Sequence, residues 1–190
     1  MLLLVGLGNP GSTYTNTRHN IGFKIIDAIN SHFKLSKQKP KFKGLLTTGN
    51  IEEKKIYAIK PLTFMNNSGT AIKELIDYFK IDAKDVIVFH DDMDIDFGKI
   101  KAKFGGTSAG HNGIESIDKF IGKDYSRVRI GIGHPKQKKK VNNHVLEDFK
   151  EDEEEKIKEI TENIVKQIPT LIDKKIDLFS SKVNQNLNGI

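Results

Sequence analysis

Two kinds of apolar pattern alternate along this chain. Short runs of consecutive apolar residues predict buried strands. These runs lie at residues 2–7, 44–50, 56–60, 86–90 and 128–132, with an extended edge at 100–104. Segments in which apolar residues recur every three or four positions predict helices at residues 20–33, 68–80 and 113–120. Asn20 and Ser68 are predicted to cap the first two helices, because such side chains accept hydrogen bonds from free backbone N–H groups.

The C-terminal part of the chain carries a long apolar stripe at helical spacing. Its members are Ile157, Ile160, Ile164, Ile168, Leu171, Ile172 and Ile176. This stripe predicts an amphipathic helix that Pro169 breaks or kinks, because proline has no N–H to donate within a helix. Strands that alternate with helices, without an internal repeat or a linker, predict one α/β domain over residues 1–190. Its central sheet should be twisted, mixed and largely parallel, with flanking helices.

Composition places the chain among soluble proteins of one domain. A length of 190 residues is enough to bury a core, and 37% of the residues are hydrophobic. No apolar run approaches the ~18 residues of a membrane span. The apolar start at residues 1–6 lacks the basic leader and cleavage site of a signal peptide. Since there is no cysteine, disulfides, thiolate nucleophiles and cysteine-ligated zinc are excluded. We expect a cytoplasmic protein that does not bind a membrane.

The formal net charge of +6 is unevenly distributed. Lysines are concentrated at residues 34–43 and 136–140 and alternate at 99–103, whereas residues 147–155 form an acidic block. Basic stripes favour a polyanionic partner such as nucleic acid. The alternative is that the chain is simply rich in lysine throughout, and charge alone does not decide between the two.

Residues 6–11 match the glycine pattern G-x-G-x-x-G of dinucleotide-binding proteins and follow a predicted strand. In that motif the helix opens within the glycines, and an acidic residue about 20 positions further on ends a second strand. Here the helix is expected to begin well beyond Gly11, and Asp27 falls inside it. The pattern therefore does not indicate dinucleotide binding.

Residues 106–110 match the nucleophile elbow G-x-S-x-G, and His134 and His144 follow in the chain order of a triad. This pattern supports a rival hypothesis, a serine hydrolase built on Ser108. An elbow requires a strand that runs directly into one sharp turn and then a helix. Because a long glycine-rich loop surrounds Ser108, a binding loop is the favoured interpretation.

An Asp-x-Asp-x-Asp pattern at residues 92–96 is similar to the start of a calcium loop. Its sixth position is Phe97 and its twelfth is Lys103, where glycine and glutamate would be required. The chain also lacks H-E-x-x-H and comparable ligand spacings. We therefore expect a solvated turn here and no metal site in the protein.

Polar residues stand directly after three predicted strands. Asn9, Asn66 and Asp91 each occupy such a position. In an open α/β sheet the loops beyond the carboxyl ends of the strands line the ligand crevice, so we expect these side chains to converge. Neutral amides bind peptide groups and stabilise oxyanions without competing for protons. Asn9, Asn66 and Asn112 are therefore suitable partners for an acid–base group.

His19 immediately precedes a predicted helix. The positive end of the helix dipole disfavours a charged imidazolium, so the ring should stay neutral and able to accept a proton. A nearby carboxylate such as Asp91 would act in the opposite direction, fixing the tautomer and stabilising the imidazolium formed during a reaction. For a lone histidine at such a position, ordinary helix capping is the alternative. The accompanying amides favour catalysis.

Several segments resemble the signature motifs of bacterial-type peptidyl-tRNA hydrolases. They occur in the family's order from residue 1 to about residue 146, and beyond this point only the helical tail agrees. The opening motif combines V-G-L-G-N-P-G with Tyr14 and T-R-H-N-I-G. The matching segments are residues 5–11, 17–22, 61–69, 90–94, 105–106, 110–113 and 127–135.

This resemblance implies hydrolysis of the ester that joins an N-blocked peptide to tRNA, without a metal or cofactor, so that the tRNA is released for reuse in translation. By similarity, His19 is the general base that activates water, and Asp91 orients it. Asn9 would contact the peptide beside the scissile ester and help to select N-blocked substrates. The implied partner is peptidyl-tRNA, bound by a monomer through its acceptor end and its peptide.

The resemblance also implies further substrate contacts. Met65 and His111 would form walls of the cleft, and Lys103 with Arg129 would grip the terminal phosphate of the tRNA. Either of two amides, Asn66 or Asn112, would stabilise the oxyanion. The side chains that hold the substrate would be Tyr14, Phe64, Asn66 and Asn112.

Two segments depart from the family pattern, and neither belongs to the expected chemistry. Ala109 stands where many relatives carry glycine, which would stiffen the loop, and residues 96–97 replace a more proline-rich turn. A non-catalytic RNA-binding protein of the same fold is a third hypothesis. The presence of both His19 and Asp91 argues against it, because a pure binder has no need of the pair.

Overall fold

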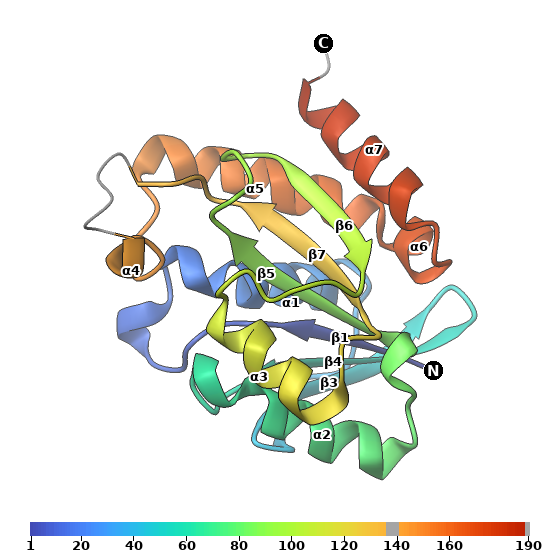
Figure 1. The fold of residues 1–190 in the computed structure, drawn as a ribbon. Coiled ribbons are helices and arrows are strands. Elements are labelled where there is room, and N and C mark those ends of the chain that lie inside the picture. The colour runs from blue at the N-terminus through green and yellow to red at the C-terminus, as the bar shows by residue number, and fades with distance from the viewer. Residues whose placement is uncertain (136–140, 189–190) are drawn as a thin grey trace.

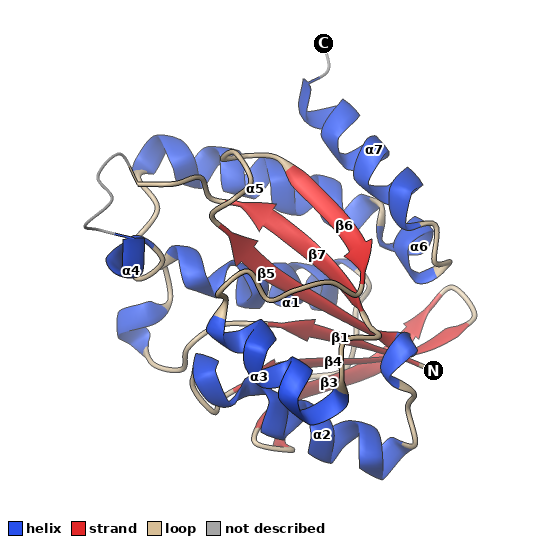
Figure 2. Cartoon of the chain, viewed as in Figure 1, coloured by secondary structure: helices blue, strands red, loops and turns tan. Residues whose placement is uncertain are grey.

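Seven strands of the described chain form one mixed sheet, which helices cover on both faces (Figure 1, Figure 2). The structure, a computed structural model, describes residues 1–135 and 141–188. The spatial order of the strands is β2-β3-β4-β1-β5-β7-β6. Their bounds are β1 Leu2–Gly6, β2 Lys39–Lys41, β3 Gly44–Ile51, β4 Lys54–Pro61, β5 Val86–Asp92, β6 Ile100–Phe104 and β7 Ser126–Gly131.

The four central strands run parallel. β4, β1, β5 and β7 pair in this way, whereas β2, β3 and β6 add antiparallel pairs toward the edges. The predicted fold class, an α/β domain with a largely parallel mixed sheet and flanking helices, is confirmed. Because the parallel strands end at the same edge, the loops that follow Gly6, Pro61 and Asp92 leave the sheet together. These loops hold most of the candidate site residues.

The side chains of β1 alternate between two hydrophobic cores. Leu2 and Leu4 pack with α1 and the C-terminal helices, while Leu3 and Val5 pack with α2 and α3. A strand buried on both faces needs no polar alternation, which explains its continuous apolar run. The helices are α1 Ile21–His32, α2 Ser68–Phe79, α3 Asn112–Ile121, α4 Val141–His144, α5 Glu151–Lys166, α6 Ile168–Ile172 and α7 Ile176–Asn188.

Local structure corrects three expectations. Asn20 occupies the N-cap position of α1, but its side chain bonds the backbone of Asn9 instead of a helix N–H. Ser68 is the first residue of α2 rather than its cap, and its hydroxyl donates to the carbonyl oxygen of Met65. The exposed strand β2 lies in a segment expected to be a lysine-rich loop, because it carries no apolar alternation that would reveal it.

Pro169 interrupts the C-terminal helix as predicted. α5 ends at Lys166, and Pro169 lies in the first turn of α6, where its missing N–H costs no hydrogen bond. α7 extends beyond the predicted stripe and buries Phe179 and Val183 in the core shared with α1. Within residues 1–135 and 141–188, no helix is long and apolar enough to cross a membrane.

The first turn of α1 lies so close to the sheet that neither Gly6 nor Gly22 has room for a Cβ atom. A Cβ at Gly6 would come within 2.2 Å of the Gly22 carbonyl oxygen, and a Cβ at Gly22 within 2.5 Å of the Phe89 carbonyl oxygen. Glycine at both positions permits this approach. It sets the turn that precedes α1, and with it His19, beside the end of β5.

Candidate active site

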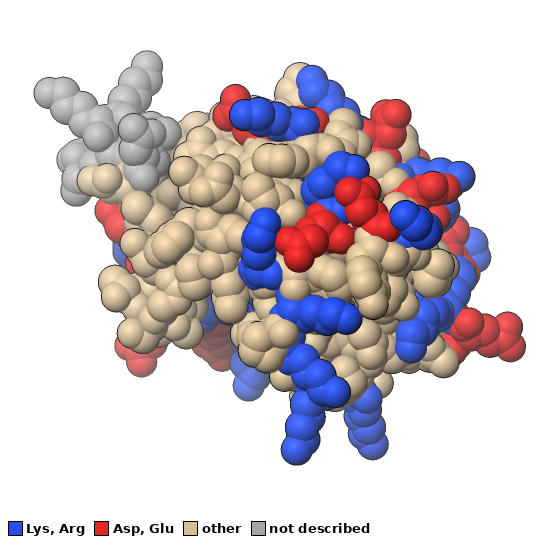
Figure 3. Space-filling view, turned by 90° about the horizontal axis from the view of Figure 1, so that it is seen from below, with Lys and Arg blue, Asp and Glu red and all other residues tan. Residues whose placement is uncertain are grey.

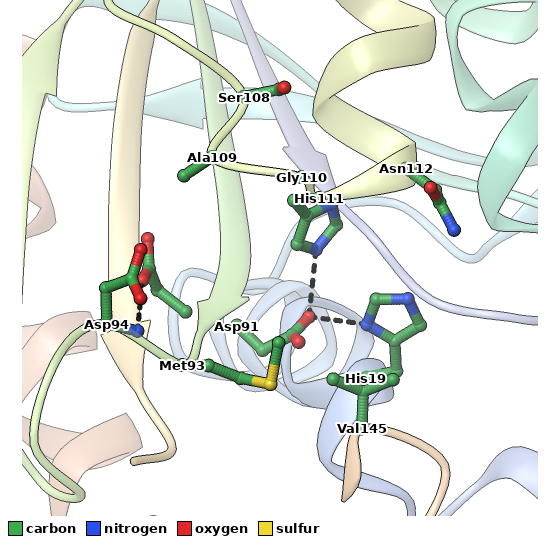
Figure 4. A pocket seen from close by; sticks show the side chains of 11 residues that line it. His19, Asp91, Met93, Asp94, Ser108, Ala109, Gly110, His111, Asn112 and Val145 are labelled. Atoms are coloured by element: carbon green, nitrogen blue, oxygen red, sulfur yellow. Dashed lines mark hydrogen bonds and ion pairs between the residues drawn. The ribbon is translucent and has the colours of Figure 1, made fainter. Parts of the chain in front are cut away.

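Asp91, at the end of β5, binds two histidines (Figure 4). Its side chain is buried, and Oδ1 accepts a hydrogen bond from Nδ1 of His19 at 2.8 Å and from Nε2 of His111 at 3.0 Å. His19 comes from the 3-10 turn η2 (Arg18–Asn20), and His111 immediately precedes α3. Three segments far apart in the sequence therefore meet at one carboxylate oxygen.

The hydrogen bond to Asp91 defines the tautomer of His19. An ionised carboxylate oxygen only accepts, so Nδ1 of His19 carries the hydrogen and Nε2 of the neutral ring keeps its lone pair. Nε2 lies on the far side of the ring from Asp91 (Figure 4). This is the form that a general base requires.

Burial alone would raise the pKa of the Asp91 carboxyl. The imidazoles of His19 and His111, which both donate hydrogen bonds to it, nevertheless hold this pKa well below its ordinary value, so Asp91 is an anion at neutral pH. His90 differs, because burial holds its pKa well below the usual range and keeps the ring neutral. Its Nδ1 lies 2.8 Å from the backbone carbonyl oxygen of Asp91.

A distant segment holds the turn that carries His19. The backbone N–H of His19 donates to the Val145 carbonyl oxygen at 2.8 Å, and that of Arg18 donates to the Glu147 carbonyl oxygen at 3.1 Å. The buried Arg18 guanidinium pairs with Glu153 of α5 at 2.7 Å. These contacts restrict the position of the imidazole. The sequence gives no sign of these contacts, because no local pattern indicates a bond across more than a hundred residues.

Among the described residues, His19, Asp91 and His111 form the one group of three or more histidine and acidic side chains that could surround a metal ion. Their ligand atoms lie within 4.8 Å of one another. These atoms are already matched, however, since both imidazole N–H groups donate to the same carboxylate oxygen. The geometry therefore favours a hydrogen-bonded acid–base network.

A cavity of about 170 Å³ lies against this network. Four expected site residues line it together, namely His19, Asp91, His111 and Asn112, the last being the exposed first residue of α3. Met93 and Val145 add apolar walls that the sequence did not indicate. The other lining residues are Asp92, Asp94, Ser108, Ala109 and Gly110.

Asn9 is fixed on both its backbone and its side chain. The Asn20 carboxamide accepts from the backbone N–H of Asn9 and donates to its carbonyl oxygen, both at 2.9 Å. Oδ1 of Asn9 accepts from the backbone N–H of Met65 at 2.8 Å, which leaves Nδ2 as the group available to a ligand. Asn9 lines a second, more open hollow of about 500 Å³ rather than the cavity beside His19.

The loop before α2 places its expected residues in different environments. Phe64 is 52% exposed with a φ of +57°, and the Tyr14 ring meets it edge-on with centroids 6.4 Å apart. Met65 is buried, and a Cβ built on Gly113 would touch both its sulfur and the His111 ring. Asn66 is exposed. Of these residues, Met65 is the one that lies beside Gly113 at the start of α3.

Lys103 on β6 and Arg129 on β7 belong to a group of cations. Lys103 lies opposite Arg127, and Nε of Arg129 donates to Oδ2 of Asp92 at 2.7 Å. Partial burial and the charges of Arg129 and Arg127 lower the pKa of Lys103. Cations held this close together are stabilised by an anionic ligand.

Basic side chains are unevenly distributed on the surface. On the face shown in Figure 3 they gather over part of the molecule, with a few acidic groups among them. The lysine cluster noted at 136–140 lies outside the described residues.

The geometry does not assemble the rival triad. Ser108 lies within the long loop that joins β6 to α3, and not at one sharp turn that leads from a strand directly into a helix. His134 pairs with Asp94 at 2.9 Å, and Nε2 of His144 lies 3.3 Å from the Ile132 carbonyl oxygen. In the part of the chain that the structure describes, no hydrogen bond joins the Ser108 side chain to either histidine.

Two other motifs are engaged within the protein. Asp92 of the acidic turn accepts from Arg129 and from the backbone N–H of Asp94. Asp27, which a dinucleotide site would use, pairs instead with Lys60 at 2.6 Å. Local contacts therefore account for both motifs.

Ala109 has a φ of +48°, in the left-handed region where glycine is favoured. The methyl group disfavours this conformation, and the stiffening of the loop beside the cavity stays a prediction.

Comparisons with known proteins show the family to which the chain belongs. The family model described as "Peptidyl-tRNA hydrolase" matches residues 3–189. A peptidyl-tRNA hydrolase of Pelagibacter ubique is 73% identical over 184 residues, covering 97% of this chain and 99% of the relative. One from Ehrlichia canis is 46% identical over 185 residues, covering 97% and 95%.

A solved structure is similar over nearly the whole chain. The crystal structure of peptidyl-tRNA hydrolase from Acinetobacter baumannii superposes with a TM-score of 0.90 at 34% identity, covering 97% of this chain and 94% of that one. The chain therefore belongs to the peptidyl-tRNA hydrolase family of enzymes.

Proposed function

We propose that this enzyme hydrolyses the ester between peptide and tRNA in peptidyl-tRNA, with His19 as general base and Asp91 as its orienting partner. The observation that carries the proposal is the bond from His19 Nδ1 to Asp91, which leaves Nε2 with its lone pair beside the cavity. A water molecule bound there would lose a proton to Nε2 as its oxygen attacks the ester carbonyl carbon.

The charges that develop in this step have partners in the site. The anionic Asp91 stabilises the imidazolium that forms when His19 takes the proton. The exposed Asn112 carboxamide, in the wall of the cavity, is a donor for the oxyanion, and Asn66 is the alternative. When the ester C–O bond breaks, the imidazolium returns its proton to the departing ribose oxygen.

Asn9 supplies a reason for selecting N-blocked substrates. Because the Met65 N–H occupies Oδ1, the carboxamide presents Nδ2 as a donor. A donor binds the carbonyl oxygen of a peptide amide, whereas it repels the ammonium group of an unblocked aminoacyl ester. The selectivity would thus come from a fixed amide orientation.

Two groups of side chains are proposed for the remaining substrate contacts, the cations on β6 and β7 and the aromatic rings of the loops. Lys103 and Arg129 are the proposed grip on the terminal phosphate, and Asp92 holds the Arg129 guanidinium through Nε. Phe64 with Tyr14 would provide an apolar surface for the peptide or the terminal nucleotide. We propose that the enzyme acts as a monomer.

The test is release of N-acetyl-aminoacyl groups from tRNA by the purified protein. His19→Ala should lower kcat by ~10²–10⁴-fold while leaving tRNA affinity near the wild-type value, because a general base acts in the transition state. Ser108→Ala is the matched control and should retain turnover. Substantial activity in His19→Ala, or its loss in Ser108→Ala, would refute this assignment.

A further inference from the structure

His111 contacts Asp91 as closely as a second member of a catalytic pair would, although it was expected only to form a wall of the cleft. We propose that His111 is a positioning residue. The hydrogen bond from the His111 N–H holds the Asp91 carboxylate and reduces the negative charge that this carboxylate presents to His19. In this way His111 sets the pH range over which His19 acts. This inference rests on the proposed role of His19 as base.

The start of α3 fixes the tautomer of His111. Its Nδ1 accepts from the backbone N–H groups of Gly113 at 3.1 Å and Ile114 at 3.3 Å, so this nitrogen carries no hydrogen. The ring hydrogen must then be on Nε2, which faces Oδ1 of Asp91. A proton added at Nδ1 would break the helix cap and place a cation at the positive end of the helix. His111 is therefore a neutral donor.

Oδ1 of Asp91 divides its charge between two donors. The bonds from His19 and His111 are of similar length, 2.8 and 3.0 Å, and the two rings lie 4.9 Å apart. Without the bond from His111, the carboxylate would attract the His19 imidazolium more strongly. His19 would then take up its proton at a higher pH, and less of the base form would remain near neutrality.

Three other titratable groups lie near this network. One of them, His90, is kept neutral by burial, and the other two lie further along the cavity. His90, on β5, faces His111 edge-on with centroids 4.8 Å apart and is bonded to the Asp91 backbone. Asp92 and Asp94 line the same cavity but are paired with Arg129 and His134. The bond from His111 to Asp91 is thus the contact whose removal isolates the effect.

Two substitutions separate the two bonds of the His111 ring. The side-chain oxygen of asparagine lies where Nδ1 does, so His111→Asn keeps the helix cap but cannot reach Asp91. The side-chain nitrogen of glutamine lies near Nε2, so His111→Gln can donate to Asp91 while it loses the cap. The experiment compares the pH dependence of kcat/KM on N-acetyl-aminoacyl-tRNA among the wild type and both variants.

We expect the acid limb of the profile to move to higher pH by roughly one unit in His111→Asn, the shift that one such hydrogen bond produces. In His111→Gln the limb should stay near the wild-type position, although the protein should be less stable without its cap. An acid limb at the wild-type pH in His111→Asn would overturn the proposal. An equal displacement in both variants would also overturn it, because the cap or the cleft wall would then be the cause.

A second readout is independent of activity. Titration of the His19 imidazole by ¹⁵N NMR in the three proteins should show the same order, with His111→Asn displaced upward from the other two. If the wild type failed to cleave N-acetyl-aminoacyl-tRNA, the proposed function would be lost, while this titration would still decide the role of His111. Identical His19 titrations in all three proteins would overturn the inference.

Discussion

Replacing Asp91 with asparagine tests whether His19 needs the negative charge of the carboxylate or only a hydrogen-bond acceptor in the same position. Asparagine is nearly isosteric and keeps one oxygen for the His19 N–H, which lies 2.8 Å away in the wild type. A hydrogen bond to a charged group contributes about 1.5–3 kcal/mol and one between neutral groups about 0.5–1.5 kcal/mol. The difference of about 1–2 kcal/mol corresponds to a loss of roughly 5- to 30-fold in kcat.

The orientation of the new amide sets the upper limit of this loss. If the NH₂ group of Asp91→Asn turns toward Nδ1 of His19, the ring must carry its hydrogen on Nε2 and can no longer accept a proton from water. The loss would then approach that of His19→Ala. Either orientation places the defect in kcat, because the imidazolium forms only during the reaction.

The assay measures kcat and KM on N-acetyl-aminoacyl-tRNA between about pH 5 and 9, with His19→Ala as the floor. Asp92→Asn is the matched control, since this neighbouring carboxylate pairs with Arg129 and its loss should appear mainly in KM. Wild-type kcat in Asp91→Asn, or a defect confined to KM, would refute the role of the charge.

Four further outcomes follow from the geometry. The fold should lose part of its acid sensitivity in Asp91→Asn: the depressed pKa of Asp91 stabilises the folded state above roughly pH 4, and this contribution is lost as the pH falls below that value. Urea unfolding at pH 7 and pH 3 should therefore show a smaller decrease in the variant than in the wild type, and equal decreases would contradict the assignment. Chelators and added divalent metals should leave the cleavage rate unchanged once tRNA folding is controlled, whereas a loss restored by one metal would defeat this expectation. Lys103→Ala and Arg129→Ala should each raise KM for full tRNA and flatten the dependence of log affinity on log salt by roughly 0.7. Substrates without the terminal phosphate should respond little, and equal losses on both substrates would indicate a folding defect instead. In Asn9→Asp one carboxylate oxygen can still accept from Met65 while the other faces the substrate, so the ratio of kcat/KM for unblocked to N-acetylated aminoacyl-tRNA should rise, and an unchanged ratio would remove Asn9 from the selectivity mechanism.

Strands, helices and the family were readable from the sequence because their signals are local. The run at residues 2–7 is apolar at every position except Gly6, and this pattern directly reflects burial on both faces of a parallel sheet. The position of Pro169 likewise predicts a break wherever the helix lies. The exposed β2, without such a pattern, escaped prediction for the same reason.

The candidate site was only partly readable. Asn9 and Asp91 follow strands, and parallel strands bring their ends together, so their presence at one edge of the sheet is a consequence of the fold class. The use of each polar atom is a different matter. The side-chain oxygen of Asn9 accepts from the Met65 N–H, and the Asn20 side chain bonds Asn9 instead of capping its helix. Both contacts depend on distances between loops. No spacing along the chain encodes those distances.

The histidine network shows most clearly what each level decides. Residue types determined which groups can exchange protons, and the resemblance of the motifs predicted that His19 and Asp91 belong to one site. Packing alone decided that His111 shares the carboxylate oxygen and that its other nitrogen caps α3. Packing also decided that Val145, far along the chain, holds the backbone of His19. Hydrogen bonds act over about 3 Å in space whatever the separation in sequence, so their partners are settled only when the sheet and its loops have closed around them.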